Sequence, residues 1–180
     1  QPFRTVLASE TIWPGTSTPS QLTVPDNVPL EVGVQFRSNK DGIIKGIRFY
    51  KGGTANGGTH IGSLWTQSGT LLASATFTNE TSSGWQEVMF ATPVNIAANT
   101  IYVASYFLPL GNYSRTANHF LTDHFNGNSL TAPDWIETPN GVYAYSSQST
   151  FPANNVGAHN YWVDVVFAAY TTTTTTFNLT

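Results

Sequence analysis

The sequence predicts an all-β fold, arranged as an antiparallel two-sheet β-sandwich that is jelly-roll-like. Three observations support this prediction. Apolar and polar residues alternate with a period of two along most of the chain, which is typical of strands with one buried face. Only 9% of the 180 residues are charged, compared with roughly 25% in average soluble domains. Turn signals separate about nine short strands, and no segment has the period of an amphipathic helix.

Alternation defines the first strands. In LEVGVQFR (residues 30–37), Leu30 and every second residue after it are apolar, whereas Glu31 and Gln35 point to the opposite face, which predicts a half-buried strand. The turn SNKDG leads into a second strand, IIKGIRFYK, and the glycine-rich stretch GGTANGG predicts an exposed loop. HIGSLWT and TLLASATFT, joined by the turn QSG, predict the next hairpin.

The later strands are less uniform. WQEVMFA alternates, but Pro93 then limits PVNIA to an edge strand or a short strand. TIYVASYF is the most apolar run and predicts a central strand, and VYAYS and YWVDVVFAAY predict the last strands. Between Leu110 and Gly141 the pattern gives way to a long polar insertion with embedded aromatic residues. Asp164 interrupts the apolar run of the final strand, and we expect it to have a structural, hydrogen-bonding role.

Both ends of the chain also have strand character. The threonines of TTTTTTFNLT are β-branched, and Phe177 and Leu179, two residues apart, can form one apolar stripe. Residues 3, 5 and 7 alternate with residues 4 and 6 in the same way. We therefore divide the chain into an N-terminal strand-like extension (1–8), a β-sandwich (9–168) and a threonine-rich strand-like tail (169–180).

Three interpretations of these ends are open. They pair with the edges of their own sandwich, or the threonines form a glycosylated stalk, or one end completes a sheet of a neighbouring subunit by strand donation. A head-to-tail contact of the last kind does not close and would build a filament. The residues that would take part in it are Phe3, Thr5, Leu7, Thr171, Thr173, Thr175, Phe177 and Leu179.

Several long strings resemble a known bacterial family. They are EVGVQFRSNKDGIIKGIRFYKG, THIGSLWTQSGTLLASATFTNETSSGWQEVMFATPV, TIYVASYFLPLGNYS, NGVYAYS and NYWVDVVF. In this order they closely resemble DUF4082, from Ser9 to Ala168, although residues 116–139 follow the family only loosely and both ends lie outside it. The resemblance implies an exported β-sandwich, of the kind found in secreted, often multi-domain surface proteins beside immunoglobulin-like or carbohydrate-active domains. It implies no activity and no catalytic residues.

Composition and charge exclude several functional classes. The net charge of −3 gives no electrostatic footprint for nucleic acid. Cysteine is absent, which excludes disulfides and thiol nucleophiles, and no apolar run reaches the roughly 20 residues of a membrane-spanning helix. We interpret Gln1, in place of an initiator methionine, as a sign of processing during export. Glycosylation sequons at Asn79, Asn112 and Asn178 agree with a secreted, extracellular glycoprotein.

No catalytic motif appears in the sequence, and we expect a protein that is not an enzyme. Asp123, Asp134 and Glu137 lie near one another only in the irregular insertion, where solvated carboxylates outnumber catalytic ones. G-x-S-x-G and phosphate-binding glycine loops are absent. His119 and His124 are five residues apart, which places them on opposite faces of a strand, so we expect no transition-metal site.

Calcium is the one cofactor for which the sequence offers candidate ligands, because calcium accepts oxygen atoms from loops. The weak candidates are Asp41, in the turn SNKDG, and Asp123, near Asn126 and Asn128 in TDHFNGN. For Asp41, ordinary turn chemistry is the simpler interpretation. We expect no other cofactor.

The aromatic residues of the insertion support an alternative function. Flat rings beside amide and carboxylate groups are typical of sugar recognition, in which the rings stack on C–H faces. The candidate ligand-binding residues are Tyr113, Asp123, Trp135, Tyr143 and Tyr145. The same rings can instead pin the long insertion to the sandwich.

Two functional hypotheses follow. The leading one is an extracellular structural subunit that self-associates into a surface fibre or filament, by donation of a terminal strand. The alternative is a carbohydrate-binding or adhesive module of a secreted protein. The expected partner is another copy of the chain or a polysaccharide, without nucleic acid and without insertion into a membrane.

Overall fold

The structure is a computed structural model and describes residues 4–125 and 128–172 of the chain. It is almost entirely β-structure, with 52% strand and 2% helix. The elements in chain order are β1 (Arg4–Val6), β2 (Gln21–Pro25), β3 (Leu30–Ser38), β4 (Gly42–Lys51), β5 (Ile61–Thr66), β6 (Leu71–Thr76), β7 (Gly84–Ile96), β8 (Tyr102–Leu108), β9 (Asn112–Arg115), the 3-10 turn η1 (His119–Leu121), β10 (His124–Phe125), β11 (Leu130–Ala132), β12 (Val142–Tyr145), β13 (Asn154–Asn155) and β14 (Val163–Thr172).

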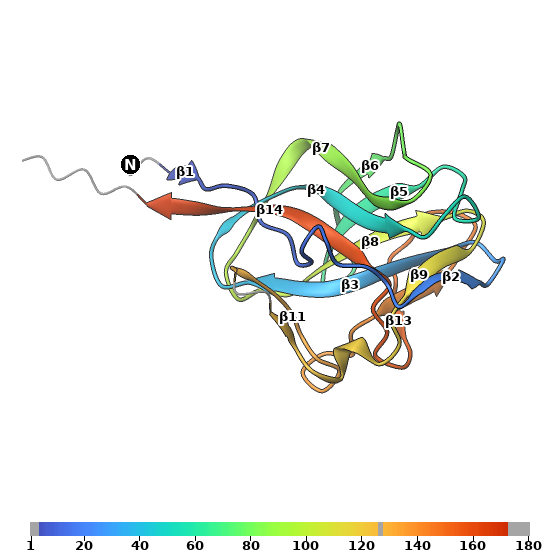
Figure 1. The fold of residues 1–180 in the computed structure, drawn as a ribbon. Coiled ribbons are helices and arrows are strands. Elements are labelled where there is room, and N and C mark those ends of the chain that lie inside the picture. The colour runs from blue at the N-terminus through green and yellow to red at the C-terminus, as the bar shows by residue number, and fades with distance from the viewer. Residues whose placement is uncertain (1–3, 126–127, 173–180) are drawn as a thin grey trace, which may run out of the picture.

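Two antiparallel sheets pack face to face and form a sandwich (Figure 1). One sheet has the strand order β1-β14-β4-β7, and the other has the order β10-β11-β3-β8-β5-β6, with β12 also beside β3. The connections from β3 to β4, β4 to β5, β6 to β7 and β7 to β8 all cross from one sheet to the other. This is the strand order of a jelly roll, which consists of two Greek keys. The predicted jelly-roll-like sandwich is confirmed.

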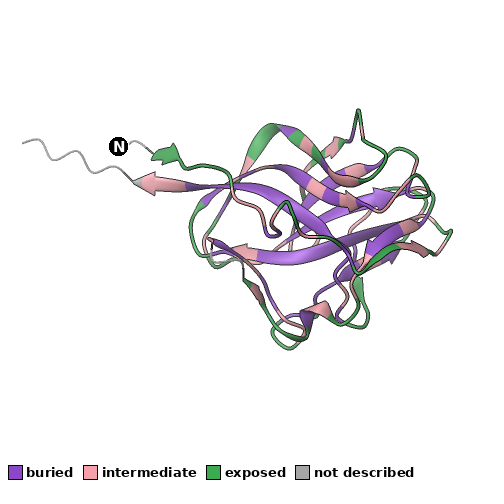
Figure 2. Ribbon diagram, viewed as in Figure 1, coloured by how far each residue is buried: buried purple, intermediate pink, exposed green. Residues whose placement is uncertain are grey.

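The core lies between the two sheets and contains the residues that alternation assigns to one face. The buried apolar side chains of β3 are Leu30, Val32, Val34 and Phe36. They share one apolar cluster with Ile44, Ile47 and Phe49 of β4 and with Val163, Val165 and Phe167 of β14. Figure 2 shows the central strands buried along most of their length.

The outer face of β3 is buried as well, so the prediction of a half-buried strand is wrong. Glu31 is fully buried, where its Oε1 accepts a hydrogen bond from Ser105 Oγ (2.6 Å) and its Oε2 one from the Thr150 N–H (3.3 Å). Gln35 is also buried, and its N–H donates to Asn140 Oδ1 (2.8 Å). Segments after β11 thus fold back over this face, which no local pattern in β3 reveals. Burial raises the pKa of Glu31 to about 7.

Strand β7 is a single strand that contains Pro93, and it forms one edge of its sheet. Its pairing with β4 shifts register between Ile44 and Gly46, and the residues opposite this shift include Pro93. A proline is tolerated at such a position because no ladder hydrogen bond needs its missing N–H. The expectation of an edge strand after Pro93 is confirmed.

Asp164 ties the beginning of the chain to β14. It is fully buried, and its Oδ1 accepts hydrogen bonds from the N–H groups of Ile12 (2.7 Å) and Val165 (2.7 Å). Its Oδ2 lies 3.4 Å from both the Trp13 N–H and Arg48 Nη2. Burial raises the pKa of the carboxyl to about 7, although the Arg48 guanidinium and the N–H donors act in the opposite direction. The structural role expected for Asp164 is confirmed.

Candidate functional site

The two ends of the described chain form one antiparallel strand pair, which we call the terminal ribbon. It consists of β1 and the last residues of β14, with Arg4 opposite Thr172, Thr5 opposite Thr171, and Val6 opposite Tyr170. Figure 1 shows the ribbon leaving the sandwich at one end. The sequence gives both segments strand character but contains no signal that they pair with each other.

In the terminal ribbon β1 is exposed, whereas the end of β14 is of intermediate burial (Figure 2). All three residues of β1 are exposed, and Val6 and the following Leu7 leave 49% and 44% of their surface open to solvent. The pairing of β14 with β4 ends at Ala169, opposite Gly42. Among the described residues, β1 is therefore the only strand that pairs with the end of β14. A two-stranded ribbon without a packed face is marginally stable in water.

Polar and aromatic contacts hold the terminal ribbon where it joins the sandwich. The Arg4 guanidinium lies 5.3 Å from the centroid of the Tyr170 ring, and Tyr170 O–H donates a hydrogen bond to Asn95 Oδ1. The Tyr170 N–H donates to the carbonyl oxygen of Asp41 (2.9 Å). A hollow of about 330 Å³ beside these residues is lined in part by Arg4, Asp41 and Tyr102. Contacts of this kind position the ribbon where it leaves the sandwich.

The structure places the predicted strand-donation residues in two groups. Thr5 and Thr171 face each other within the same chain, and Leu7 donates its N–H to the carbonyl oxygen of Ala169 (2.9 Å). Phe3, Thr173, Thr175, Phe177 and Leu179 lie outside the described residues.

A second group of candidate residues forms what we call the tyrosine cluster: Tyr113, Tyr143, Tyr145 and Tyr161. Tyr113 is on β9 and Tyr143 and Tyr145 are on β12, whereas Tyr161 precedes β14. The ring centroids of Tyr143 and Tyr145 are 5.8 Å apart, and those of Tyr113 and Tyr161 are 5.4 Å apart. Burial raises the pKa of Tyr161, and the phenols of the other three tyrosines raise it further, which agrees with their proximity.

Tyr145 is the exposed member of the tyrosine cluster. It leaves 55% of its surface open, and its O–H donates a short hydrogen bond to Asp26 Oδ2 (2.6 Å). This hydrogen bond raises the pKa of Tyr145 to about 12. Tyr143 is half-buried and pairs with Asn154 of β13, which is exposed. The cluster thus offers an aromatic ring beside a carboxylate and an amide at the surface.

The structure does not bring Asp123 and Trp135 to the tyrosine cluster. The Trp135 N–H donates to the carbonyl oxygen of Phe120 (2.7 Å), and its partly buried side chain packs on the core. Asp123 Oδ1 accepts a hydrogen bond from the N–H of Asp134 (2.6 Å). These residues flank β11, which pairs with Arg37 and Ser38 at one end of β3. Strand β12, with its tyrosines, pairs with residues 30–33 at the other end.

The predicted calcium ligands already accept hydrogen bonds from backbone N–H groups. Asp41 Oδ1 accepts one from Ala98 (2.9 Å), as Asp123 does from Asp134. Asn128 Nδ2 donates to the carbonyl oxygen of Thr11 (2.8 Å), and Asn126 lies outside the described residues. Within residues 4–125 and 128–172, no three His, Cys, Asp or Glu side chains form a group that could hold a metal ion.

The sequons lie in different environments. Asn79 is exposed in the turn between β6 and β7, with a positive φ of 56°. Asn112 is half-buried on β9, where its Nδ2 donates to the carbonyl oxygen of Leu110 (3.1 Å). Asn178 lies outside the described residues.

Two histidines gather around the buried Trp13. The ring centroid of Trp13 is 5.1 Å from that of His119 and 4.0 Å from that of His124, and the two imidazoles are 5.6 Å apart. The expectation of opposite strand faces is wrong, because His119 lies in η1 and His124 in β10. Burial lowers the pKa of His119 to about 4 and also lowers that of His124.

His60 forms a separate buried network that holds the glycine-rich loop before β5. Its Nδ1 lies 2.8 Å from Glu80 Oε1 and its Nε2 lies 2.9 Å from Asn56 Oδ1. Lys51 Nζ donates to the other oxygen of Glu80 (2.8 Å). Burial lowers the pKa of His60, and the Glu80 carboxylate acts in the opposite direction. This arrangement fits a structural network, because all of these groups bond to one another.

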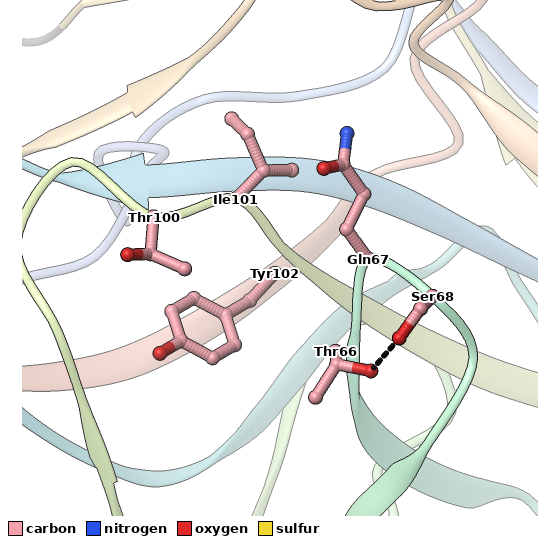
Figure 3. A pocket seen from close by; sticks show the side chains of 6 residues that line it. All are labelled: Thr66, Gln67, Ser68, Thr100, Ile101 and Tyr102. Atoms are coloured by element: carbon pink, nitrogen blue, oxygen red, sulfur yellow. Dashed lines mark hydrogen bonds between the residues drawn. The ribbon is translucent and has the colours of Figure 1, made fainter.

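The hollow in Figure 3 has a volume of about 450 Å³ and lies beside the turn between β5 and β6. Its lining residues are Thr66, Gln67, Ser68, Thr100, Ile101 and Tyr102. None of them is a candidate ligand residue from the sequence, and none carries a carboxylate or an imidazole. All of these residues except Ile101 carry a hydroxyl or an amide group.

The helical content of residues 4–125 and 128–172 is confined to the short turn η1, and no helix in these ranges has the length and apolarity needed to cross a membrane.

Comparison with known proteins identifies one family. The chain matches the model of the family described as Domain of unknown function (DUF4082) over residues 16–163. A search of the curated proteins finds no match. The matched region contains the whole tyrosine cluster, whereas β1 and all but the first residue of β14 lie outside it. Because the match covers well over half of the sequence, the chain belongs to the DUF4082 family.

Proposed function

We propose that this protein is an extracellular, non-enzymatic structural subunit that associates with other copies of itself through the terminal ribbon. The observation that carries this proposal is the free edge of β1. Among the described residues, β1 pairs on one side only, with β14, and all three of its residues are exposed. An unpaired strand edge is a template for pairing with another chain.

The hydrogen-bond pattern of the ribbon identifies the free groups. The Leu7 N–H donates to the carbonyl oxygen of Ala169 (2.9 Å), so these two residues form a hydrogen-bonded pair. In an antiparallel ladder such pairs alternate with pairs whose N–H and C=O groups point away from each other. Val6 is the next residue and therefore directs its N–H and C=O away from β14, toward the free edge.

The energetics favour the addition of a strand to this edge. A third strand would convert a marginal two-stranded ribbon into a small sheet. It would also cover part of Val6 and Leu7, which are exposed apolar residues in a chain with few charges. Burial of apolar surface contributes about 25 cal/mol per Å².

The extracellular location is part of the proposal and rests on sequence. The chain belongs to the DUF4082 family, and its resemblance to that family implies an exported protein. The chain also carries the three sequons described above. Calcium is left out of the proposal, because the Asp41 and Asp123 carboxylates lie in separate loops and already bind backbone N–H groups.

The test compares Val6→Pro with Val6→Thr in the full chain. Proline removes the outward N–H of residue 6 without breaking the ladder to β14, whereas threonine retains it. We expect concentration-dependent oligomers of the wild type and of Val6→Thr in sedimentation velocity, and monomers of Val6→Pro at the same concentrations. A wild type that stays monomeric, or a Val6→Pro profile equal to that of the wild type, contradicts the proposal.

The second candidate function is carbohydrate binding by the tyrosine cluster. The specific observation in its favour is the exposed Tyr145 ring, held at an angle of 77° to Tyr143 and bonded to Asp26. Stacking of a ring on a sugar face, beside hydrogen-bonding groups, is a common mode of recognition. Asn154 would supply the amide at this surface.

The test of this second function is affinity electrophoresis in gels that contain soluble polysaccharides. We expect Tyr145→Ala to lose the retardation that the wild type shows in at least one polysaccharide. Trp135→Ala is the matched control, because Trp135 lies at the other end of β3, and it should migrate as the wild type does. Equal retardation of the wild type and Tyr145→Ala removes this candidate.

A further inference from the structure

Strand β6 is the least protected edge of the larger sheet. It pairs only with β5 among the described residues, and its sequence LLASAT contains neither a charge nor a proline. Natural edge strands usually carry charges, prolines or bulges, or are very short, because an unprotected edge pairs with other chains. An edge strand of six residues with neither a charge nor a proline therefore calls for an explanation in terms of a partner.

The other edges of the two sandwich sheets are either protected in these ways or very short. Strand β7 carries Glu87 and Pro93 and a register shift, and β10 and β13 have two residues each. The edge of β1 carries the charged Arg4. Among these edges, only β6 is longer than three residues and carries neither a charge nor a proline; its one register shift lies near its start, between Leu71 and Ala73, and Ser74 and Thr76 lie beyond it.

The free hydrogen-bonding groups of β6 can be assigned to residues. The Phe77 N–H donates to the carbonyl oxygen of His60 (3.0 Å), and the register places Ser74 opposite Ser63 and Thr76 opposite Ile61. Counting back from the hydrogen-bonded pair at Phe77, Thr76 and Ser74 fall in the alternate pairs. Their N–H and C=O groups therefore point away from β5, and both residues are exposed.

We propose that β6 of one copy accepts β1 of a second copy, so that the sheets of the two copies join edge to edge. The inference rests on the self-association proposed above and names the surface that receives the terminal ribbon. The contact is heterologous, because β1 and β6 are different surfaces of the same molecule. Figure 1 shows the ribbon leaving one end of the sandwich, while β6 belongs to its body. Repetition of such a contact gives an open chain of subunits.

The side chains of the two edges complement each other. On the accepting side, Leu71 of β6 leaves 49% of its surface exposed. The incoming segment brings Val6 and Leu7, which are exposed apolar residues.

The test uses two single variants and their mixture in sedimentation velocity. Ser74→Pro removes an outward N–H of β6 and keeps β1 intact, whereas Val6→Pro removes an outward N–H of β1 and keeps β6 intact. We expect each variant alone to be monomeric. Their equimolar mixture should form a heterodimer and nothing larger, because it retains one functional donor and one functional acceptor. Ser74→Ala, which keeps the N–H, should form the same oligomers as the wild type.

The outcomes separate the inference from the proposed function. If Val6→Pro is monomeric but Ser74→Pro forms the oligomers of the wild type, β1 pairs with a surface other than β6, such as β1 of the second copy. The inference about β6 then fails, whereas the proposed self-association through β1 stands. If the two variants are monomeric but do not combine, the inference also fails. A monomeric wild type, or a Val6→Pro variant that associates normally, overturns both proposals. If Ser74→Pro unfolds at a lower urea concentration than Ser74→Ala, Ser74→Lys replaces it, because a lysine on an edge also blocks pairing.

Discussion

The outer face of β3 and the terminal ribbon reverse the usual distribution of residues. On β3 and β14 the polar side chains Glu31 and Asp164 are fully buried, whereas on the ribbon the apolar side chains Val6 and Leu7 are exposed. Buried polar groups are informative exceptions in a folded protein. The exposed Val6 and Leu7 are informative because they lie on and beside a strand that, among the described residues, pairs on one side only.

The two exceptions differ in whether residues of the same chain satisfy their hydrogen-bonding and packing requirements. Both buried carboxylates accept several hydrogen bonds from their own chain, so a structural role accounts for their burial. For the ribbon, no contact among the described residues explains why its apolar side chains are exposed, since β1 pairs on one side only and little of its surface is packed. We therefore attribute a stabilising role to the buried polar groups and propose an interaction role for the exposed edge.

The largest expected effect is the loss of stability in Asp164→Ala. The substitution leaves the buried N–H groups of Ile12 and Trp13 without their acceptor, and it leaves Arg48 without its partner. We expect the free energy of unfolding to fall by about 3–5 kcal/mol, the range for breaking a buried charge pair. Urea denaturation of the monomeric protein, followed by tryptophan fluorescence, measures this change. A loss below about 1 kcal/mol would mean that Asp164 is not the anchor of the N-terminal segment.

The next effect concerns the pH dependence of stability, which Glu31→Gln should change. Burial raises the pKa of Glu31 in the folded protein to about 7, from its ordinary 4.5, so the folded state binds this proton more tightly than the unfolded state. The stabilisation from this proton is present below pH 4.5 and is lost as the pH rises through 7. Glutamine cannot ionise and does not lose it.

Urea denaturation of the wild type and of Glu31→Gln at pH 5, 6, 7 and 8 measures this difference. The wild type should lose stability relative to the variant by roughly 1 kcal/mol per pH unit between pH 5 and 7. Taking the difference cancels the buried histidines, whose lowered pKa values act in the opposite direction in both proteins. Parallel curves over the whole range would show that Glu31 does not titrate in this way.

The sequence predicts the parts of this comparison that depend on local pattern. Alternation in LEVGVQFR identifies the core residues of β3, and the isolated carboxylate in YWVDVVF identifies Asp164 as structural. The same alternation fails for Glu31, because the residue that covers it, Thr150, lies 119 positions further along the chain. A period of two reports which residues share a face, and it contains no information about what later covers that face.

The candidate sites show the same limit. Tyr113, Tyr143 and Tyr145 are predicted as one group, but the group also contains Tyr161 and the carboxylate of Asp26, which the sequence gives no reason to add. Trp135 and Asp123 are separated from it because β11 and β12 pair with opposite ends of β3. The two terminal segments are identified as strands, yet their pairing joins residues from the two ends of the chain.

The smallest expected effect is that of Val6→Pro on the stability of the monomer, and it tests the other half of the comparison. Val6 is exposed and directs its N–H away from β14, so the substitution breaks no ladder hydrogen bond and buries no polar group. We expect the free energy of unfolding to change by less than about 0.5 kcal/mol, the usual range for surface substitutions. Urea denaturation at a concentration where the wild type is also monomeric makes the two proteins comparable. A loss of more than about 1 kcal/mol would mean that β1 stabilises the sandwich itself, and its exposed edge would then be a structural feature rather than an interaction surface.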